Sequence, residues 1–479
     1  MSLFVGTARR DITPDWPVML GGFGQRTTAS TGTLDRVHAK ALHLLDTDAD
    51  ERILLLTTDL IATPSPIAKA VVARLSNMTG LAASSICISA SHSHSAPVPF
   101  DPSPDATGVA RFSSSLIEAL VDVGQRAVAT SRPARLRTAG GRVGFLHNRW
   151  TRGNPNHVDD RVCVAVFDDA STDRPMSVLF GVGCHPVTLG WDNMAISADY
   201  PGVAQRLIEE RLGASEALFF NATDGSVIPN TRPNHDSLDP RGYCGGSYHD
   251  TLDIGTQLAD AVLDAVQTAT VFAGPGPVAA RRVDLTLDPN TGGMDPLAAD
   301  QRLLDVTAEL RSFLGDDVFD TVPAAAMWSA ASAHVVEHDL LEPEMRRLMI
   351  ATCLFLGLTA RRARGGATPP VHVPVQLLRI GPFELLALPG EPMLEVGEEW
   401  QRRVGDKTGF VMGLSNSHLR YLPRQSQFEQ SDSGSRYETV TAGLAPHGVE
   451  LILDRATELF AEAKSTSHSP TRSRATREA

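Results

Sequence analysis

The sequence predicts an α/β protein in which a mixed, largely buried sheet is flanked by helices and interrupted by a helical insertion. Short runs rich in Val, Ile, Leu and Phe recur through the first 290 residues, and turn residues bound each run. Helical patterns follow several of these runs, as in sheets whose strands alternate with helices. Strands that are apolar almost throughout are typical of a sheet that is covered on both faces.

Six of the expected strands end at polar or metal-capable side chains. These strands span residues 52–58, 85–90, 176–183, 217–220, 383–388 and 409–414. Residues 66–75 and 204–212 have the apolar spacing of helices. In an open α/β sheet, the loops at the C-terminal ends of the strands converge, and ligands bind there. We therefore expect a metal site at the C-terminal ends of these strands.

Residues 296–365 interrupt the strand pattern. Apolar residues recur there at helical spacing around Leu303, Met327 and Leu348, and the strand pattern resumes near Val371. We interpret this segment as a helical insertion. Insertions of this length that lie beside a site often form its wall or lid.

The rest of the chain is expected to form one domain. The first 290 residues contain no internal repeat and no linker rich in Pro, Gly or Ser. Residues 1–464 therefore form a single domain in this interpretation. Residues 465–479 contain almost no apolar side chains among their Ser, Thr, Pro and Arg residues, which predicts a disordered tail.

Composition excludes several classes of function. The chain has 43 Lys and Arg against 56 Asp and Glu, a formal charge of -13, which argues against a nucleic-acid partner. No run of apolar residues is long enough for stable membrane insertion or for a signal peptide. The five cysteines form no C-x-x-C pair. We expect a cytoplasmic protein with reduced thiols, and the sequence leaves its oligomeric state unknown.

Three histidines lie at the ends of expected strands. His92 and His94 are two residues apart, so extended backbone places both imidazoles on one side of the chain, where they can bind a metal. Hydrogen-bonded surface histidines are the alternative. His185 follows another strand and precedes Pro186, and a buried histidine without a metal is the alternative there.

Glu391 and Tyr421 complete the candidate site. Glu391 follows the strand at 383–388, where a buried carboxylate is costly unless a salt bridge or a cation compensates it. Tyr421 could equally be a packing residue. Because His92, His185, Glu391 and Tyr421 all lie at strand ends, together they predict an open zinc site with room for water.

A second metal motif competes with this one. The run from His334 through Glu337 to His338 is an H-x-x-E-H, which on a helix places both imidazoles on one face, as in inverted zinc proteases. A polar helix face is the alternative. No G-x-S-x-G, G-x-x-x-x-G-K-[ST] or strand-linked G-x-G-x-x-G occurs, so an elbow-type serine hydrolase and a nucleotide-binding protein are not predicted.

These motifs together resemble the catalytic N-terminal domain of the neutral/alkaline non-lysosomal ceramidases, zinc amidases that cleave the amide of N-acyl sphingosine. Residues 5–14 look like the opening of that family, and residues 91–97 are similar to its T-H-T-H-S-G-P segment. The resemblance implies that His92 is a zinc ligand. It also implies that His94 contacts the scissile group rather than the metal.

The resemblance extends to the remaining site residues. It implies that Arg149, in the pair Asn148-Arg149, lines the substrate site, and that His185 and Glu391 are ligands. Tyr421 falls where the ligating tyrosine is found and would also stabilise the oxyanion. Residues 197–202 look like family sequence that opens a helix. Asp59 and Asp224 are expected beside the metal ligands, as hydrogen-bond partners of the imidazoles.

Two departures qualify the resemblance. The family has a serine with a catalytic role in a G-D-x-S-P-N type segment, and residues 225–230 place Ile228 at that position. The secreted family members have an additional C-terminal β-sandwich, whereas this sequence ends soon after Tyr421. We therefore expect a small soluble N-acyl amide as the substrate partner, rather than ceramide in a membrane.

The function that the resemblance implies is zinc-dependent hydrolysis of a linear, ceramide-like N-acyl amide by attack of metal-bound hydroxide. A zinc esterase or lactonase on the same scaffold is one alternative. A metal-stabilised binding protein without catalysis is another, and Ile228 favours it.

Overall fold

The computed structural model describes most of the chain. Described are residues 3–99, 107–150, 154–213, 216–231, 236–291, 296–364, 368–404, 408–430, 432, 434 and 436–466. The tail expected over 465–479 lies outside the described residues from 467 onward, and residues 465 and 466 end the last helix.

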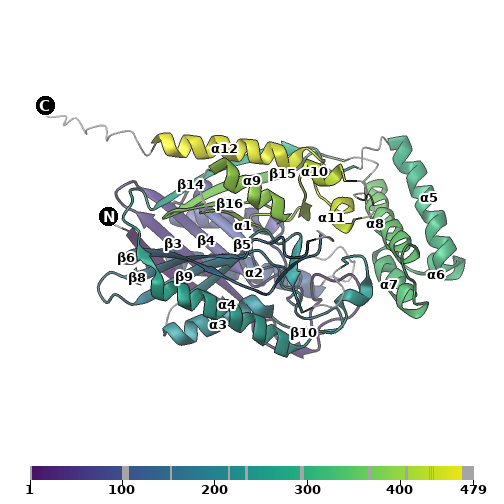
Figure 1. Cartoon of the computed structure of the whole chain (residues 1–479), viewed down its shortest axis with the longest axis horizontal. Helices are drawn as coiled ribbons and strands as arrows, with labels where there is room; N and C mark the ends of the chain where they lie inside the picture. The colour runs from purple at the N-terminus through teal and green to yellow at the C-terminus, as the bar shows by residue number, and fades with distance from the viewer. Residues whose placement is uncertain are drawn as a thin grey trace.

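A nine-stranded mixed sheet forms the centre of the fold (Figure 1). Its strands, in spatial order, are β11 (Glu216–Asn221), β9 (Pro175–Val182), β8 (Arg161–Asp169), β6 (Arg132–Arg142), β1 (Leu3–Asp11), β3 (His38–Asp46), β4 (Glu51–Thr58) and β5 (Ile86–Ala90), with β13 (Thr270–Val271) beside β6. Along β4, Ile53 and Leu55 enter one core while Leu54 and Leu56 enter another. The expected mixed, largely buried sheet is therefore confirmed.

The direction of the strands differs from that of an open parallel sheet. Only the outer pairs β4–β5 and β9–β11 are parallel, and the strands between them are antiparallel. The sheet twists and curls so far that β11 contacts β5. This curl brings the C-terminal ends of β5, β9 and β11 together, although they lie at opposite ends of the strand order.

Four helices cover this sheet. α1 (Ser65–Thr79) and α2 (Thr107–Ala129) pack on one face, and α3 (Asp199–Leu212) and α4 (Tyr248–Thr268) pack against β8, β9 and β11. Local sequence explains their ends. α1 ends at Gly80, whose φ of 72° suits glycine, and Ser247 with Asp250 forms a capping box that begins α4. α3 begins earlier than the helix expected from residue 204.

A second, four-stranded sheet lies against the first. Its strands are β14 (Val278–Leu287), β15 (Val371–Ile380), β16 (Phe383–Ala387) and β18 (Gly409–Met412). One hydrophobic core contains side chains of both sheets. α9 (Leu394–Val404) and α12 (Gly448–Thr466) cover its outer face, so the layers run helix, sheet, sheet, helix (Figure 1).

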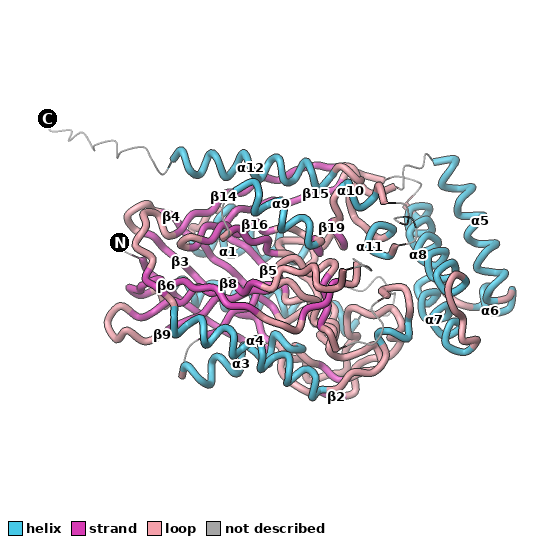
Figure 2. The backbone as a smooth tube through the Cα atoms, in the orientation of Figure 1, coloured by secondary structure: helices cyan, strands magenta, loops and turns pink. Residues whose placement is uncertain are grey.

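The expected helical insertion is helical. It contains α5 (Pro296–Leu314), α6 (Asp316–Thr321), the 3₁₀ turn η3 (Ala324–Ala326), α7 (Met327–Glu337) and α8 (Glu344–Ala363). β15 resumes the sheet at Val371, as expected. These helices form a separate body at one end of the molecule and have a hydrophobic core composed mostly of their own side chains (Figure 2).

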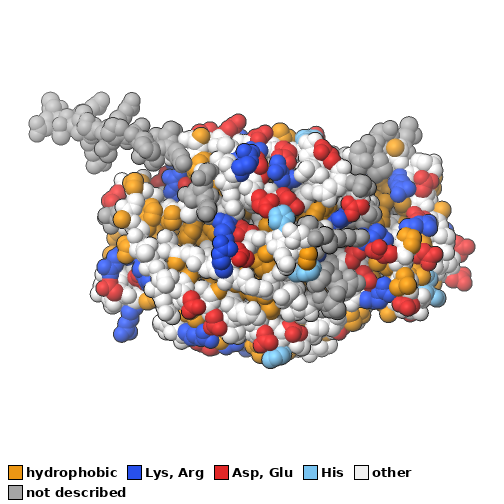
Figure 3. All heavy atoms as spheres, viewed as in Figure 1, with side chains coloured by type: hydrophobic (Ala, Val, Ile, Leu, Met, Phe, Trp, Pro, Cys, Tyr) orange, Lys and Arg blue, Asp and Glu red, His pale blue; other side chains and the backbone are white. Residues whose placement is uncertain are grey.

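Short elements connect these layers. They are β2 (Gly32–Thr33) with β10 (Ala195–Ile196), β7 (Leu146–Asn148) with β12 (Val227–Pro229), β17 (Glu391–Pro392) with β19 (Tyr421–Leu422), the turns η1 (Ala83–Ser85) and η2 (Pro240–Tyr243), and the helices α10 (Gln425–Phe428) and α11 (Tyr437–Val440). Basic and acidic side chains lie interspersed on the face shown in Figure 3. Within the described ranges, no helix has both the length and the hydrophobicity needed to cross a bilayer.

Candidate metal centre

The C-terminal ends of β5 and β9 carry the two histidines that the sequence predicts as ligands. His92 lies two residues beyond β5, and its φ of 74° is a left-handed conformation that is costly for a histidine. His185 lies three residues beyond β9. Both side chains are buried, and their ring centroids are 4.8 Å apart. Strained backbone at His92 is typical of a residue held in place by a functional site.

Glu391 lies between these two imidazoles. Its Oε2 is 3.2 Å from His185 Nε2 and 3.5 Å from His92 Nε2. The pairing of β17 with β19 places Glu391 directly beside Tyr421 in register. Three of the four predicted ligands therefore converge on one point, from segments about 90 to 300 residues apart in the chain.

The hydrogen bonds of the two rings leave their metal-binding nitrogens available. His92 Nδ1 donates to the carbonyl of Ile61 at 2.7 Å, and His185 Nδ1 donates to the carbonyl of Asp224 at 2.6 Å. Because a carbonyl only accepts, both Nδ1 atoms carry a proton, and the Nε2 atoms face Glu391, where each can bind a metal once it is deprotonated. Ligating histidines are held in this way in metal sites.

Tyr421 lies beside the cluster, and its hydroxyl contacts Arg149. Arg149 Nη2 donates to the Tyr421 hydroxyl at 3.0 Å, and the rings of Tyr421 and His185 stack at 6.2 Å between centroids. Burial and the nearby Glu391 carboxylate hold the pKa of Tyr421 well above its usual value. The structure thus places Tyr421 at the site without a direct contact between its hydroxyl and an imidazole nitrogen.

His94 joins the same cluster. Its Nε2 is 3.3 Å from His92 Nε2, and one ring nitrogen from each of His92, His94 and His185 lies within 4.8 Å of the others. His94 Nδ1 makes no hydrogen bond to any described residue, and the ring meets Phe23 edge to face at 4.8 Å. His94 could therefore be a third nitrogen ligand or the substrate contact that the family resemblance implies.

The charges within the cluster are strongly coupled. Burial opposes protonation of His92, but the Glu391 carboxylate outweighs it and raises the pKa of His92 to about 9. Burial and the guanidinium of Arg149 lower the pKa of His185 to about 4. Burial, with His92 and His185, holds the pKa of His94 well below its usual value. A buried carboxylate among imidazoles whose Nε2 atoms converge fits a divalent cation, and this set of nitrogen and oxygen donors suits zinc.

Arg149 is the centre of a second group of contacts that the sequence only partly predicts. Its Nη1 donates to the Tyr243 hydroxyl at 2.8 Å, its Nη2 donates to the Gly225 carbonyl at 2.9 Å, and its Nε is 3.3 Å from Glu438. Neither Tyr243 nor Glu438 was expected at the site, because nothing in their local sequence distinguishes them. These contacts hold the guanidinium beside Tyr421.

His418 is a further site residue that the sequence analysis missed. Its Nε2 is 3.1 Å from Glu391 Oε1, on the carboxylate oxygen that does not face the other two histidines. A signal was available, because His418 follows the strand at 409–414 as the other candidates follow theirs. The carboxylate of Glu391 is therefore surrounded by three imidazoles.

The expected role of Asp59 is wrong, whereas that of Asp224 as a hydrogen-bond partner of an imidazole agrees with the structure. The Asp59 carboxylate accepts from Gln205 Nε2 at 2.8 Å and from the backbone of His38 at 2.8 Å, and the carbonyl of Ile61 serves His92 instead. Asp224 does contact His185, but through its carbonyl, and its carboxylate is 4.0 Å from Nδ1. Burial raises the pKa of that carboxyl to about 7.

A cavity of about 490 Å³ opens onto the cluster. The site residues line it, and much of the remaining wall comes from residues 19–26, which the sequence analysis did not single out. Those residues approach their neighbours closely: a Cβ at Gly22 would lie 2.3 Å from the ring of His94, and one at Gly24 would lie 2.6 Å from Trp328. Arg26 donates to the carbonyl of His94, among others, and fixes this wall.

The helical insertion contributes to the same cavity. Ala325 of η3 and Trp328 of α7 line it, and Ser329 Oγ lies 3.4 Å from the carbonyl of Gln25. The expectation that an insertion of this length forms a wall of the site thus agrees with the structure.

The competing H-x-x-E-H motif lies away from this cavity. His334 and His338 lie at the C-terminal end of α7 with ring centroids 4.2 Å apart. Glu337 and His338 are exposed. Across the described part of the chain, neither histidine belongs to a group of three or more metal-capable side chains. The alternative of a polar helix face describes this motif better.

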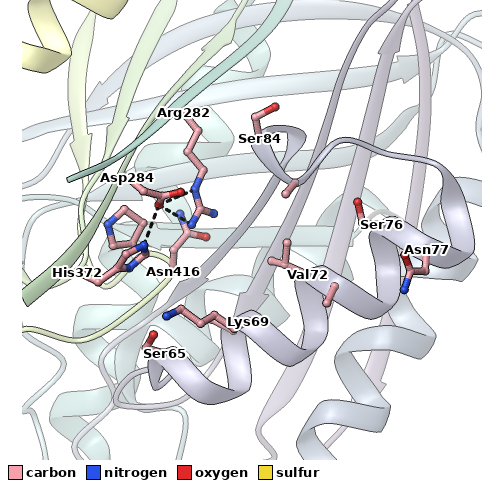
Figure 4. Close-up of a pocket in the computed structure, with 14 residues that line it drawn as sticks. Ser65, Lys69, Val72, Ser76, Asn77, Ser84, Arg282, Asp284, His372 and Asn416 are labelled. Atoms are coloured by element: carbon pink, nitrogen blue, oxygen red, sulfur yellow. Dashed lines mark hydrogen bonds and ion pairs between the residues drawn. The ribbon is translucent and has the colours of Figure 1, made fainter. Parts of the chain in front are cut away.

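A second cavity, of about 440 Å³, lies between α1 and the strands β14 and β15 (Figure 4). Lys69 of α1 points across it toward Asp284 and His372. Arg282 Nη2 donates to Asp284 Oδ1 at 2.9 Å, and His372 Nε2 lies 3.5 Å from the same oxygen. Arg282 and His372 thus both engage the same carboxylate. Of the residues that the structure describes, the one group of three or more metal-capable side chains lies in the first cavity.

The fold and the site together define a class of protein. It is an α/β protein whose buried, curled sheet gathers histidines and a carboxylate at its strand ends in an arrangement that could hold a metal ion.

Comparison with known proteins identifies the family. Residues 3–247 match the family described as neutral/alkaline non-lysosomal ceramidase, N-terminal, and the chain belongs to this family. It is 23% identical over 474 residues to a neutral ceramidase from Mycobacterium tuberculosis, an alignment that covers 87% of this chain and 70% of the relative. The resemblance inferred from the sequence is therefore confirmed.

Solved structures agree on the fold. The crystal structure of neutral ceramidase from Pseudomonas aeruginosa matches with a TM-score of 0.69 and 18% identity, covering 99% of this chain and 76% of the other. A structure described as a ceramidase complexed with C2 matches with a TM-score of 0.70 and 17% identity, covering 99% and 77%.

Proposed function

We propose that this protein is a zinc-dependent hydrolase that cleaves linear, ceramide-like N-acyl amides. The observation that carries the proposal is the convergence of His92, His185 and Glu391, with both Nε2 atoms directed at one carboxylate oxygen. His92, His185 and Glu391 would hold the zinc ion, with Tyr421 beside them as the expected fourth ligand. A zinc ion held there would polarise the amide carbonyl and lower the pKa of a bound water to near neutrality.

Tyr421 and Arg149 would stabilise the oxyanion in this proposal. Arg149 Nη2 donates to the Tyr421 hydroxyl at 3.0 Å, and both residues line the cavity. The tyrosine hydroxyl, with its pKa raised, stays protonated and can donate to an oxygen that gains negative charge. Donors positioned before the reaction usually supply the largest catalytic effect.

His94 would act first as the general base and then as the general acid. Its imidazole is neutral at physiological pH because burial and the other histidines lower its pKa. A neutral imidazole that lines the cavity can accept a proton and return it to the leaving amine. Of its two ring nitrogens, Nε2 faces the cluster, 3.3 Å from His92 Nε2, whereas Nδ1 is buried.

A covalent serine route has little support in this chain. The hydrocarbon side chain of Ile228 offers no nucleophile, and it is fully buried in an apolar cluster with Val187 and Tyr243. Ser226 is also buried, and its Oγ accepts the backbone N–H of Leu394 at 3.1 Å. The proposed mechanism therefore uses water as the nucleophile.

The relatives support an amide substrate, since they are named ceramidases. An ester or a lactone would be hydrolysed by the same mechanism, so both are tested beside the amides. A cytoplasmic location stays a prediction. All five cysteines, each among the described residues, are free thiols, which suits a reducing compartment.

The proposal is tested by metal analysis of wild type, His185→Ala and Glu391→Ala, combined with hydrolysis of N-acyl amides and esters with and without chelator. We expect about one zinc per chain in wild type. Both variants should lose the metal together with chelator-sensitive amide cleavage, because each removes a ligand of the same ion.

Two results would contradict the proposal. Zinc retained in both variants would exclude this site. Zinc lost without any turnover by wild type would instead favour a metal-stabilised binding protein.

A further inference from the structure

Three arginines line the cavity at the candidate metal centre, and two of them are fully engaged. Arg26 donates to backbone carbonyls of Gly21, His94, Gly190 and Trp191. Arg149 contacts two tyrosine hydroxyls, a carbonyl and Glu438. The protein therefore holds both guanidinium groups in place, Arg149 beside Tyr421 at the proposed oxyanion position, and neither is free to bind a second anionic group of the substrate.

Arg420 is the third. Its side chain is exposed, lines the cavity, and forms no hydrogen bond or ion pair with any described residue. The carboxylates on the cavity wall are engaged elsewhere, since Asp239 binds Arg241 and Glu391 binds the histidines. Arg420 therefore gives the cavity an uncompensated positive charge on a chain whose formal charge is -13.

The backbone fixes Arg420 next to the candidate ligands. It precedes Tyr421 directly, and its carbonyl accepts the N–H of Glu391 at 2.9 Å. A Cβ at Gly390 would lie 2.4 Å from that carbonyl, so a glycine is required for this approach. With a φ of 59°, the Arg420 backbone is in the left-handed region that disfavours most side chains. A costly conformation beside the site suggests that the direction of this side chain has a function.

Part of the cavity wall is apolar. Met19, Leu20, Phe23, Val98 and Trp328 line it. An acyl chain fits such a wall, whereas an exposed guanidinium favours a carboxylate, sulfonate or phosphate.

We infer that the substrates are N-acyl amines whose amine part carries an anionic group, and that Arg420 binds this group. The inference rests on the proposed amide hydrolysis and names its substrate class. The anion would lie a few bonds from the scissile nitrogen, because Arg420 is adjacent to Tyr421 in the chain.

The test compares kcat/KM for N-decanoylglycine and N-decanoylethanolamine, which differ mainly in a carboxylate against a hydroxymethyl group. At low salt we expect wild type to prefer the glycine conjugate by about tenfold, and added salt should reduce this ratio. Arg420→Ala should bring the ratio close to one, and Arg420→Lys should keep part of it. N-decanoyltaurine shows whether a sulfonate serves as well as a carboxylate.

Arg302→Ala is the matched control. Arg302 is an exposed arginine on α5 that does not line the cavity, so its loss changes the net charge equally and should leave the ratio unchanged. Zinc content and circular dichroism of Arg420→Ala establish that its fold is intact. An unchanged ratio in Arg420→Ala, or a wild-type preference for the neutral substrate, would overturn the inference.

A binding measurement separates this inference from the proposed function. Decanesulfonyl derivatives of glycine and ethanolamine cannot be cleaved in the same way, and calorimetry gives their affinities for the full-length protein as purified. If no amide is hydrolysed, the hydrolase proposal fails, yet tighter binding of the glycine derivative that Arg420→Ala abolishes still supports the anion site. Equal binding of the two derivatives to wild type refutes it.

Discussion

Two pairs of histidines in this protein lie equally close together but in different surroundings. The rings of His92 and His185 are 4.8 Å apart, and those of His334 and His338 are 4.2 Å apart. The first pair is buried, comes from two strand ends, and has Glu391 between its Nε2 atoms. The second pair lies on one turn at the end of α7. Proximity along a helix comes from the backbone alone, whereas convergence of distant segments with a buried carboxylate indicates a site.

The largest effect is expected at the buried pair, and replacing one histidine of each pair tests the comparison. His92→Ala should lose the bound zinc and reduce kcat/KM by about 10³-fold or more, because the metal supplies several kcal/mol of transition-state stabilisation. His334→Ala should keep both the zinc and the activity of wild type. Metal content and amidase kinetics of the two variants show which pair binds the metal. The reverse pattern would show that the H-x-x-E-H motif is the metal site.

A smaller effect is expected at His418, which contacts the Glu391 oxygen that faces neither His92 nor His185. His418→Ala should weaken zinc binding by about 10–100-fold, since hydrogen bonds to a ligating carboxylate have effects of this size. Zinc should still bind at saturating concentration. His372→Ala, a half-exposed histidine beside Asp284, is the control. Competition with a chelator measures the zinc affinities of both variants. Equal affinities would show that His418 does not contribute to the metal site.

The last effect concerns stability rather than the site and is expected at His43, which is buried but belongs to no cluster of the described histidines. Its Nδ1 lies 2.6 Å from Ser131 Oγ, and burial, with Arg52 nearby, lowers its pKa to about 4. Because the unfolded chain binds a proton more readily, stability is fully present above pH 6.5 and falls as the pH drops toward 4, by at most about 3 kcal/mol.

His43→Asn keeps the contact to Ser131 and cannot titrate. Its free energy of unfolding should therefore depend less on pH than that of wild type between pH 6.5 and 4, in urea titrations at each pH. Its zinc content should be normal, because burial alone does not make a metal ligand. Parallel pH profiles for the two proteins would show that His43 titrates normally in the folded state.

The sequence predicts this fold and site where signals are local. Apolar runs that end in polar residues locate β4, β5, β9 and β16 to within about two residues, and the family-like motifs identify His92, His185 and Glu391. The curl of the sheet could not be predicted, because it depends on antiparallel pairings between distant strands. For the same reason the sequence does not predict Tyr243 and Glu438, which contact Arg149 only in the folded chain. The loop at 19–26 was overlooked, although three glycines in four residues suggest close backbone approach.

The helical insertion has a consequence for how this protein can diverge. Residues from α5, α7 and α8 form most of a hydrophobic core of their own, while every candidate zinc ligand lies outside the insertion. Ala325 and Trp328 nevertheless line the cavity. One contiguous segment can therefore be exchanged or remodelled to admit a different acyl group, while the chemistry at the strand ends is inherited unchanged.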